Sequence, residues 1–80
     1  MDALTAATEA ADTTRPEDGL RAVAALRRLT DSLELAQVEA ALRAGMGWIE
    51  IASCLGVSRQ AVHQKYAKRV QPGLAPTRRR

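Results

Sequence analysis

The sequence is poor in aromatic residues: it has no phenylalanine, one tryptophan and one tyrosine among 80 residues. Apolar residues still make up 46% of the chain, and alanine, leucine, valine and isoleucine supply most of them. Alanine and leucine favour helices, and the chain has no long run of the β-branched residues that favour strands. The composition therefore predicts an all-α protein. The length allows one small domain, whose marginal core would be stabilised by oligomerisation.

Other absences narrow the class of protein. Cys54 is the only cysteine, so no internal disulfide forms and nothing indicates an oxidising compartment. No apolar run is long enough to cross a membrane, and the first residues lack the basic start and apolar stretch of a secretory signal. We therefore expect a cytoplasmic protein with no membrane partner, in which Cys54 is a packing residue.

Catalytic patterns are missing as well. The chain shows no Ser/His/Asp set, no phosphate-binding loop and no pair of carboxylates in its basic part. His63 is the only histidine, and no cysteine or second histidine stands at metal-ligand spacing from it. We therefore expect neither an enzyme nor a cofactor nor a metal site.

Acidic residues are absent from the last thirty positions. Residues 51–80 carry seven lysines or arginines, whereas residues 1–50 carry all nine acids and five arginines. The basic end is the natural surface for a polyanion such as nucleic acid. A solvated basic helix followed by a tail would give the same pattern, so charge alone does not decide the function.

The chain divides into three parts by composition. Residues 1–15 have little to bury, which predicts a disordered arm. Pro16, followed by two acids, suits the first turn of a helix. Two prolines and a glycine predict that residues 71–80 form a flexible basic tail. The folded domain is expected over residues 16–70, with an N-terminal dimerisation helix.

The segment from residue 17 to residue 44 has helical spacing and is followed by two nearby glycines. Asp31 followed by Glu34 resembles a capping box, which would start a second helix at Ser32. The apolar spacing nevertheless continues without a slip. This favours one long or slightly kinked helix over two helices.

Two apolar stripes run along this segment. The first is a heptad seam, spaced three and four apart, made of Leu26, Leu29, Leu33, Ala36 and Ala40. The second comprises Leu35, Val38, Ala41 and Leu42. We predict that the second stripe packs on the C-terminal part of the domain. The seam is then the interface of a homodimer, with further contacts from Leu20 and Val23; one broad core face on a monomer is the alternative.

The segment from Trp48 to Tyr66 has the pattern of a short helix, a tight turn and a second helix. Ile51 and Leu55 are four residues apart and so share one face of the first helix. Trp48 opens this helix and is expected to pack against the upstream helix. Gly56 stands where the chain must turn, because glycine adopts positive φ without strain. Val57 is expected to fill the corner. Ser58 then caps the second helix, which points Val62 and Tyr66 into the core.

The spacing of Ala52, Gly56 and Val62 resembles the helix-turn-helix of bacterial repressors and the last DNA-binding region, region 4, of sigma factors. The run from Gly56 to His63 is especially similar to short helix-turn-helix proteins of actinobacteria. It also resembles homeodomain-like helix-turn-helix modules. The motif covers about a quarter of the chain. One departure is Lys65, where the family often has an apolar residue, so we expect Tyr66 to supply the inward side chain on a slightly rotated helix.

The resemblance implies that residues 59–69 form the helix that enters the DNA major groove. The residues expected to contact bases are Arg59, Gln60, His63 and Gln64, since arginine pairs with guanine and glutamine with adenine. The residues expected to contact phosphate are Ser58, Lys65, Lys68, Arg69, Arg78, Arg79 and Arg80. An uninvolved surface position is the alternative for His63.

The sequence therefore predicts a sequence-specific transcriptional regulator that binds double-stranded DNA as a homodimer and is associated with the nucleoid. One alternative is an architectural, nucleoid-type DNA binder of low specificity. The other is an adaptor that uses the helix-turn-helix shape to dock on RNA polymerase or another regulator. The salt dependence of binding affinity, measured on specific and on scrambled DNA, separates these functions.

Overall fold

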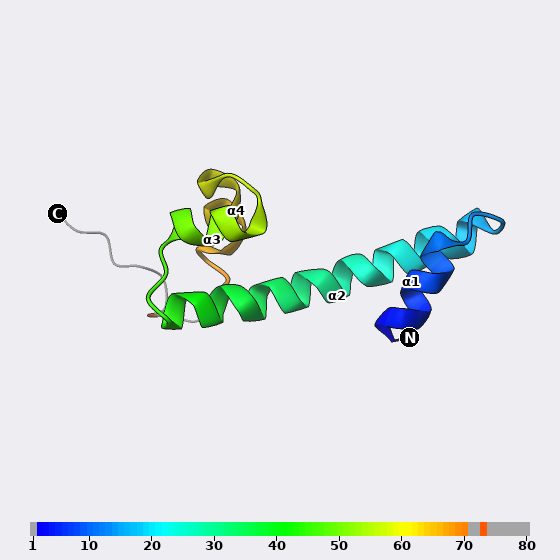
Figure 1. Ribbon diagram of the computed structural model, residues 1–80, viewed down its shortest axis with the longest axis horizontal. Helices are drawn as coiled ribbons and strands as arrows, with labels where there is room; N and C mark the ends of the chain where they lie inside the picture. Colours follow the sequence, from blue (N-terminus) through cyan, green and yellow to red (C-terminus); the bar gives the residue numbers. More distant parts are fainter. Residues whose placement is uncertain (1, 71–72, 74–80) are drawn as a thin grey trace. The chain divides into compact units, whose positions relative to one another are not determined.

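The computed structural model describes residues 2–70 and 73, and the regular structure in this part of the chain is entirely helical (Figure 1). Four helices follow one another: α1 (Ala3–Ala11), α2 (Pro16–Arg43), α3 (Trp48–Leu55) and α4 (Arg59–Tyr66). The predicted all-α class, with a long helix preceding a smaller helical unit, is confirmed. The chain separates into an N-terminal unit, Met1–Leu33, and a C-terminal unit, Glu34–Arg80.

The prediction of a disordered arm over residues 1–15 is wrong, because residues 3–11 form α1. The Asp2 carboxylate caps this helix by accepting a hydrogen bond from the Thr5 backbone N–H at 2.7 Å. Alanine has the highest helix propensity, and α1 is rich in it. Ala6 is buried, so the segment has a packed face that its scarcity of large apolar residues did not suggest.

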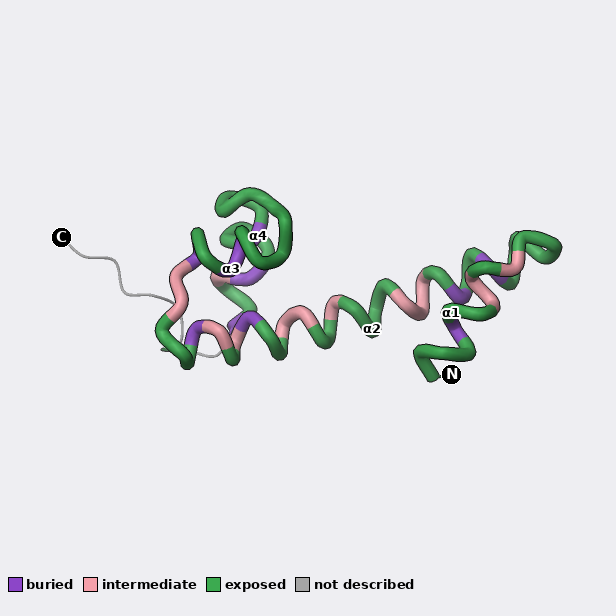
Figure 2. Tube along the Cα trace, viewed as in Figure 1, coloured by how far each residue is buried: buried purple, intermediate pink, exposed green. Residues whose placement is uncertain are grey.

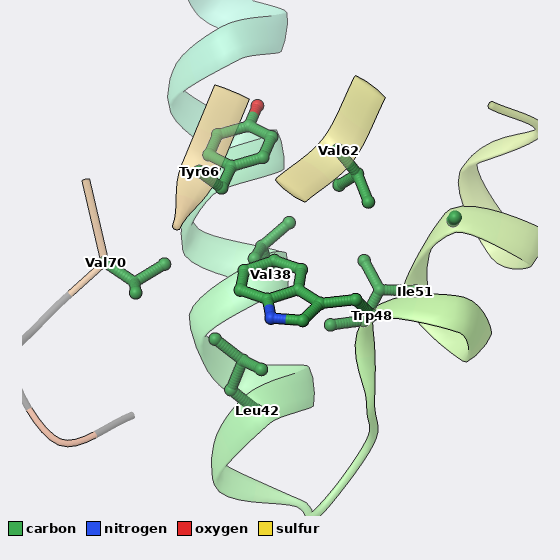
Figure 3. Close-up of a cluster of buried hydrophobic side chains, with 8 residues drawn as sticks. Val38, Leu42, Trp48, Ile51, Val62, Tyr66 and Val70 are labelled. Atoms are coloured by element: carbon green, nitrogen blue, oxygen red, sulfur yellow. The ribbon is translucent and has the colours of Figure 1, made fainter. Parts of the chain in front are cut away.

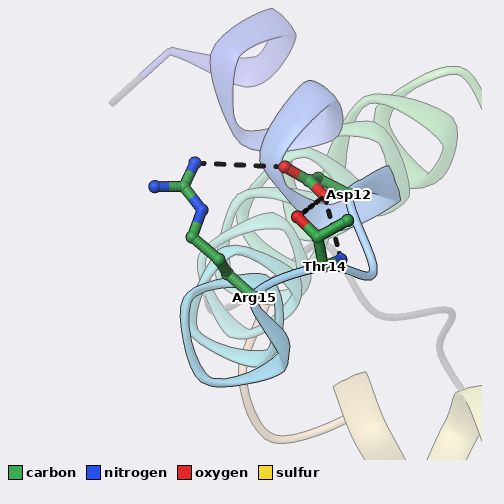
Figure 4. A network of polar contacts seen from close by, with 3 residues as sticks. All are labelled: Asp12, Thr14 and Arg15. Carbon is green, nitrogen blue, oxygen red and sulfur yellow. Dashed lines mark hydrogen bonds and ion pairs between the residues drawn. The ribbon is translucent and has the colours of Figure 1, made fainter.

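A short polar turn joins α1 to α2 (Figure 4). Asp12 accepts hydrogen bonds from both the backbone N–H and the hydroxyl of Thr14, at 2.9 and 2.6 Å. These bonds lower the pKa of the Asp12 carboxyl, and Arg15 adds an exposed ion pair at 3.9 Å. Gly19 lies so near α1 that a Cβ there would be 3.5 Å from the Asp12 carbonyl oxygen. Gly19 therefore lets the start of α2 pass close to the end of α1, and Ala22, almost one turn further along α2, is buried.

The helix α2 runs without a break for 28 residues, so the single long helix is confirmed and the second start at Ser32 is not found. Glu34 bonds to residues of α4 instead of acting in a capping box. The helix ends in a Schellman motif, in which Gly45 N–H donates to the Leu42 carbonyl and Met46 N–H donates to the Ala41 carbonyl. Gly45 has a φ of 91°, which only glycine adopts cheaply.

The core of the C-terminal unit gathers side chains from the end of α2, from α3 and from α4 (Figure 3). Leu35 and Ala41 pack against it, so the predicted second stripe of α2 does face α3 and α4. Trp48 is buried there too, as expected. The buried cluster consists of Val38, Leu42, Trp48, Ile51, Ala52, Val62, Tyr66 and Val70.

The turn between α3 and α4 follows the predicted pattern at two positions and departs from it at a third. Gly56 has a φ of 72°, and Val57 N–H donates to the Ala52 carbonyl at 3.1 Å. Ser58 Oγ accepts a hydrogen bond from Ala61 N–H at 3.0 Å, which confirms the cap. Val57 does not fill the corner, because 47% of it is exposed. The backbone bonds at Gly56 close the turn without that side chain.

Candidate nucleic-acid interface

The helix α4 has one buried face and one solvent face. Val62 and Tyr66 are buried in the core, which confirms that Tyr66 takes the inward position left by Lys65 (Figure 3). The helix ends at Tyr66, and Ala67–Arg69 form a turn, so the predicted helix over residues 59–69 is three residues too long. The Arg69 N–H donates to the Tyr66 carbonyl, a tighter spacing than that of an α-helix.

All four residues expected to contact bases are exposed, and most of α4 has the green of exposed residues in Figure 2. At about 100° per residue, Gln60 and Gln64 lie on the side of α4 opposite Val62 and Tyr66. Those two glutamines therefore form the outermost part of the candidate interface. The other pair, Arg59 and His63, lies on a flank of the helix.

This flank faces the beginning of α3. The His63 and Trp48 rings meet edge to face, with 5.5 Å between their centroids and 85° between their planes. Arg59 lines a shallow surface hollow together with Gly47 and Glu50 at the same end of α3. Sequence reasoning missed this relationship, since nothing in local spacing pairs a residue of one helix with a residue across the turn. His63 is thus positioned by α3 as well as by its own helix, and Arg59 lies beside the same end of α3.

The opposite flank of α4 faces α2. Glu34 Oε2 accepts a hydrogen bond of 2.6 Å from the Tyr66 hydroxyl and another of 3.2 Å from Lys65 Nζ. Burial raises the pKa of Tyr66, and the bond to the Glu34 carboxylate raises it further. Lys65 was expected to contact phosphate; in the free protein its ammonium is held by a carboxylate instead.

The remaining residues expected to contact phosphate stand at different places. Lys68 and Arg69 follow α4 and are exposed, and the Arg69 guanidinium lies 5.4 Å from the centre of the Tyr66 ring. Ser58 is exposed at the start of α4, where a helix presents its unpaired N–H groups. The three arginines at 78, 79 and 80 lie outside the described residues.

The predicted dimer seam lies largely open on α2. Leu29 is 38% exposed and Leu33 59% exposed, while Leu26 is half-buried. The alanines Ala36 and Ala40 are also exposed. Large apolar side chains are thus available at the centre of the seam and small ones at its C-terminal end. The two residues expected to extend the seam, Leu20 and Val23, are exposed as well.

Comparison with protein families, curated proteins and solved structures finds no match to this chain. Within the described residues, no helix combines the length and apolar character needed to span a membrane. In the same part of the chain, no cluster of three or more histidine, cysteine, aspartate or glutamate side chains is suited to hold a metal ion. Function must therefore be argued from the residues of the candidate interface.

Proposed function

We propose that this chain is a sequence-specific DNA-binding transcriptional regulator that acts as a homodimer and inserts α4 into the major groove. The observation that supports the proposal best is the division of α4 into two faces. Two large side chains, Val62 and Tyr66, fix the helix to the core, and its other side presents exposed polar residues and no acid. A helix with such a surface has the shape and chemistry for reading base edges.

The exposed residues suit distinct tasks in such a complex. Gln60 and Gln64 are outermost and offer amide groups that match adenine. Arg59, on the flank toward α3, offers two donors to guanine. Ser58, with the amides of the first turn, suits a phosphate, as do Lys68, Arg69 and the arginines of the tail. This arrangement assigns sequence readout to α4 and general affinity to the residues around it.

A homodimer follows from the size of the interface and from the seam. One short helix reads only a few base pairs, whereas two copies placed about 34 Å apart read two half-sites. The exposed leucines Leu29 and Leu33 lie on α2 and are not members of the buried cluster of the C-terminal unit. Pairing two seams would cover these leucines without disturbing the core. Arg27 and Arg28 would stay at the rim of the interface.

The test begins with selection of bound sequences from a pool of random duplex DNA, followed by titrations with the selected duplex and a scrambled one over a range of salt. A regulator keeps a large affinity ratio, on the order of a thousand or more, as salt rises. The variant Thr13→Ala, in the exposed turn of the N-terminal unit, is the matched control and should bind like the parent.

Two other results would replace this proposal. Equal affinity for both duplexes at every salt concentration would indicate an architectural binder. Absence of DNA binding at moderate salt would indicate an adaptor for another protein. A selected sequence with two inverted half-sites would support the regulator and the homodimer together.

A further inference from the structure

We propose that Glu34 is a positioning residue that controls the selectivity of α4, and that it does so in two ways. It fixes the C-terminal end of α4 against α2, and it keeps the Lys65 ammonium from strengthening binding to arbitrary DNA. This inference rests on the proposed DNA-binding function. It adds a residue that lies outside the candidate interface and carries a charge of the wrong sign for DNA.

The first role follows from how little holds α4 in place. The helix has eight residues and buries only Val62 and Tyr66 among them. The Tyr66 hydroxyl donates its 2.6 Å bond to Glu34, a residue 32 positions earlier and on another helix. One of the two anchors of α4 is therefore tied directly to α2. Loss of this bond would leave α4 freer to turn about its remaining anchor, and base readout depends on such angles.

The second role concerns the charge of Lys65. Its Nζ lies 3.2 Å from the same Glu34 oxygen that Tyr66 binds, and 5.3 Å from the centre of the Tyr66 ring. The lysine side chain is 41% exposed, so the charge stands at the edge of α4 and not inside the core. A lysine that contacts DNA phosphate increases affinity for every sequence. The Glu34 carboxylate competes with phosphate for this ammonium.

The two roles act on different kinds of binding. Holding Tyr66 favours the selected sequence, because only that sequence needs a defined orientation of α4. Holding Lys65 disfavours all sequences alike. Glu34 therefore raises the ratio of specific to non-specific affinity by both routes. A residue that only stabilised the fold would change both affinities in the same direction.

The experiment compares Glu34→Gln with the parent full-length chain on the selected and scrambled duplexes. We expect tighter binding to scrambled DNA, a salt slope steeper by roughly 0.9 for the added phosphate contact, and a lower affinity ratio. The single variant Lys65→Gln should bind DNA with the same salt slope as the parent. Combined with Glu34→Gln in a double variant, it should remove the added salt slope. Tyr66→Phe should lower the affinity ratio severalfold without altering the slope.

Thermal unfolding of each variant shows whether it is folded under the binding conditions. If Glu34→Gln binds both duplexes with the affinity and slope of the parent, the inference is overturned while the DNA-binding function stands. If the parent itself prefers no sequence, the proposed function fails instead. Should Glu34→Gln be unfolded, Lys65→Gln decides in its place, because a shallower slope in that single variant would contradict the role given to Glu34.

Discussion

The indole ring of Trp48 and the imidazole ring of His63 meet nearly at right angles, 5.5 Å between centroids, and so join the first residue of α3 to the middle of α4. This contact separates the four expected base-contacting residues into two kinds. His63 already has a partner within the protein, whereas Gln60 and Gln64 point away from the core. Effects of substitution on DNA binding should follow this division.

We expect Gln60→Ala to weaken binding to the selected duplex by roughly 1–3 kcal/mol and to weaken binding to scrambled DNA much less. Arg59→Ala should have a similar effect, because Arg59 is the first residue of the same helix. Competition titrations on the two duplexes measure the difference. If both variants bind the selected duplex like the parent, the outward face of α4 has been assigned wrongly.

Trp48 and its neighbour Ile49 provide a matched test of the core. Trp48 is buried in the cluster, whereas Ile49 is 70% exposed on the same turn of α3. Trp48→Ala should cost about 3–5 kcal/mol of unfolding free energy, since it removes a large buried ring and leaves a cavity. Ile49→Ala should change stability by less than about 0.5 kcal/mol. Urea unfolding followed by circular dichroism measures both, and similar losses would contradict the described core.

Gly56 provides a test of the turn between α3 and α4. Its φ of 72° lies in the left-handed region, although a Cβ there would meet no neighbour within 4 Å. Gly56→Ala should therefore lose about 1–2 kcal/mol through backbone strain alone. Gly56→Asn should lose less, because asparagine tolerates this conformation better. A larger loss for Gly56→Asn than for Gly56→Ala in chemical unfolding would mean that side-chain size, and not φ, is the constraint.

Much of the C-terminal unit could be predicted because its signals are local. Gly56 and Ser58 stand at fixed offsets between two short apolar patterns, and each has one conformational use. The same logic placed Val38 and Leu42 of α2 toward the core, since helical spacing reveals a shared face.

The remainder depends on contacts that local patterns do not encode. Glu34 looked like part of a helix start, but its carboxylate bonds to Tyr66 on another helix. In α1, capping by Asp2 and the packing of the small residue Ala6 replace the large apolar side chains whose absence suggested disorder. Lys65 was placed correctly on the surface, but its ion pair could be seen only in three dimensions.

The single tyrosine allows a direct test of the environment of Tyr66. Its pKa is raised above the usual value of 10.0, chiefly by burial and then by the bond to Glu34. The stabilisation that this raised pKa represents is complete below pH 10 and is lost as pH rises through the pKa of the folded protein. Titration followed by phenolate absorbance should therefore show that Tyr66 of the folded protein ionises above pH 10. In the unfolded chain the same tyrosine should ionise at a lower pH. In Tyr66→Phe this contribution to the fall of unfolding free energy at alkaline pH should disappear. If the unfolding free energies of both proteins depend on alkaline pH in the same way, the described burial is contradicted.

The homodimer is tested most directly at the centre of the seam. Leu29 and Leu33 are 38% and 59% exposed, so changing both to glutamate should leave the folded monomer intact. In a dimer the same change places charges inside an apolar interface, where their desolvation is costly.

We therefore expect the parent to sediment as a dimer at micromolar concentration, and the double variant to sediment as a monomer with much weaker binding to a two-half-site duplex. Leu4→Glu, at an exposed leucine of α1, is the matched control for added charge and should remain dimeric. The short seam offers few leucine layers, so the association should depend strongly on these two. A parent that sediments as a monomer yet binds the selected duplex tightly would rule out the dimer and leave α4 to act as a single reading helix.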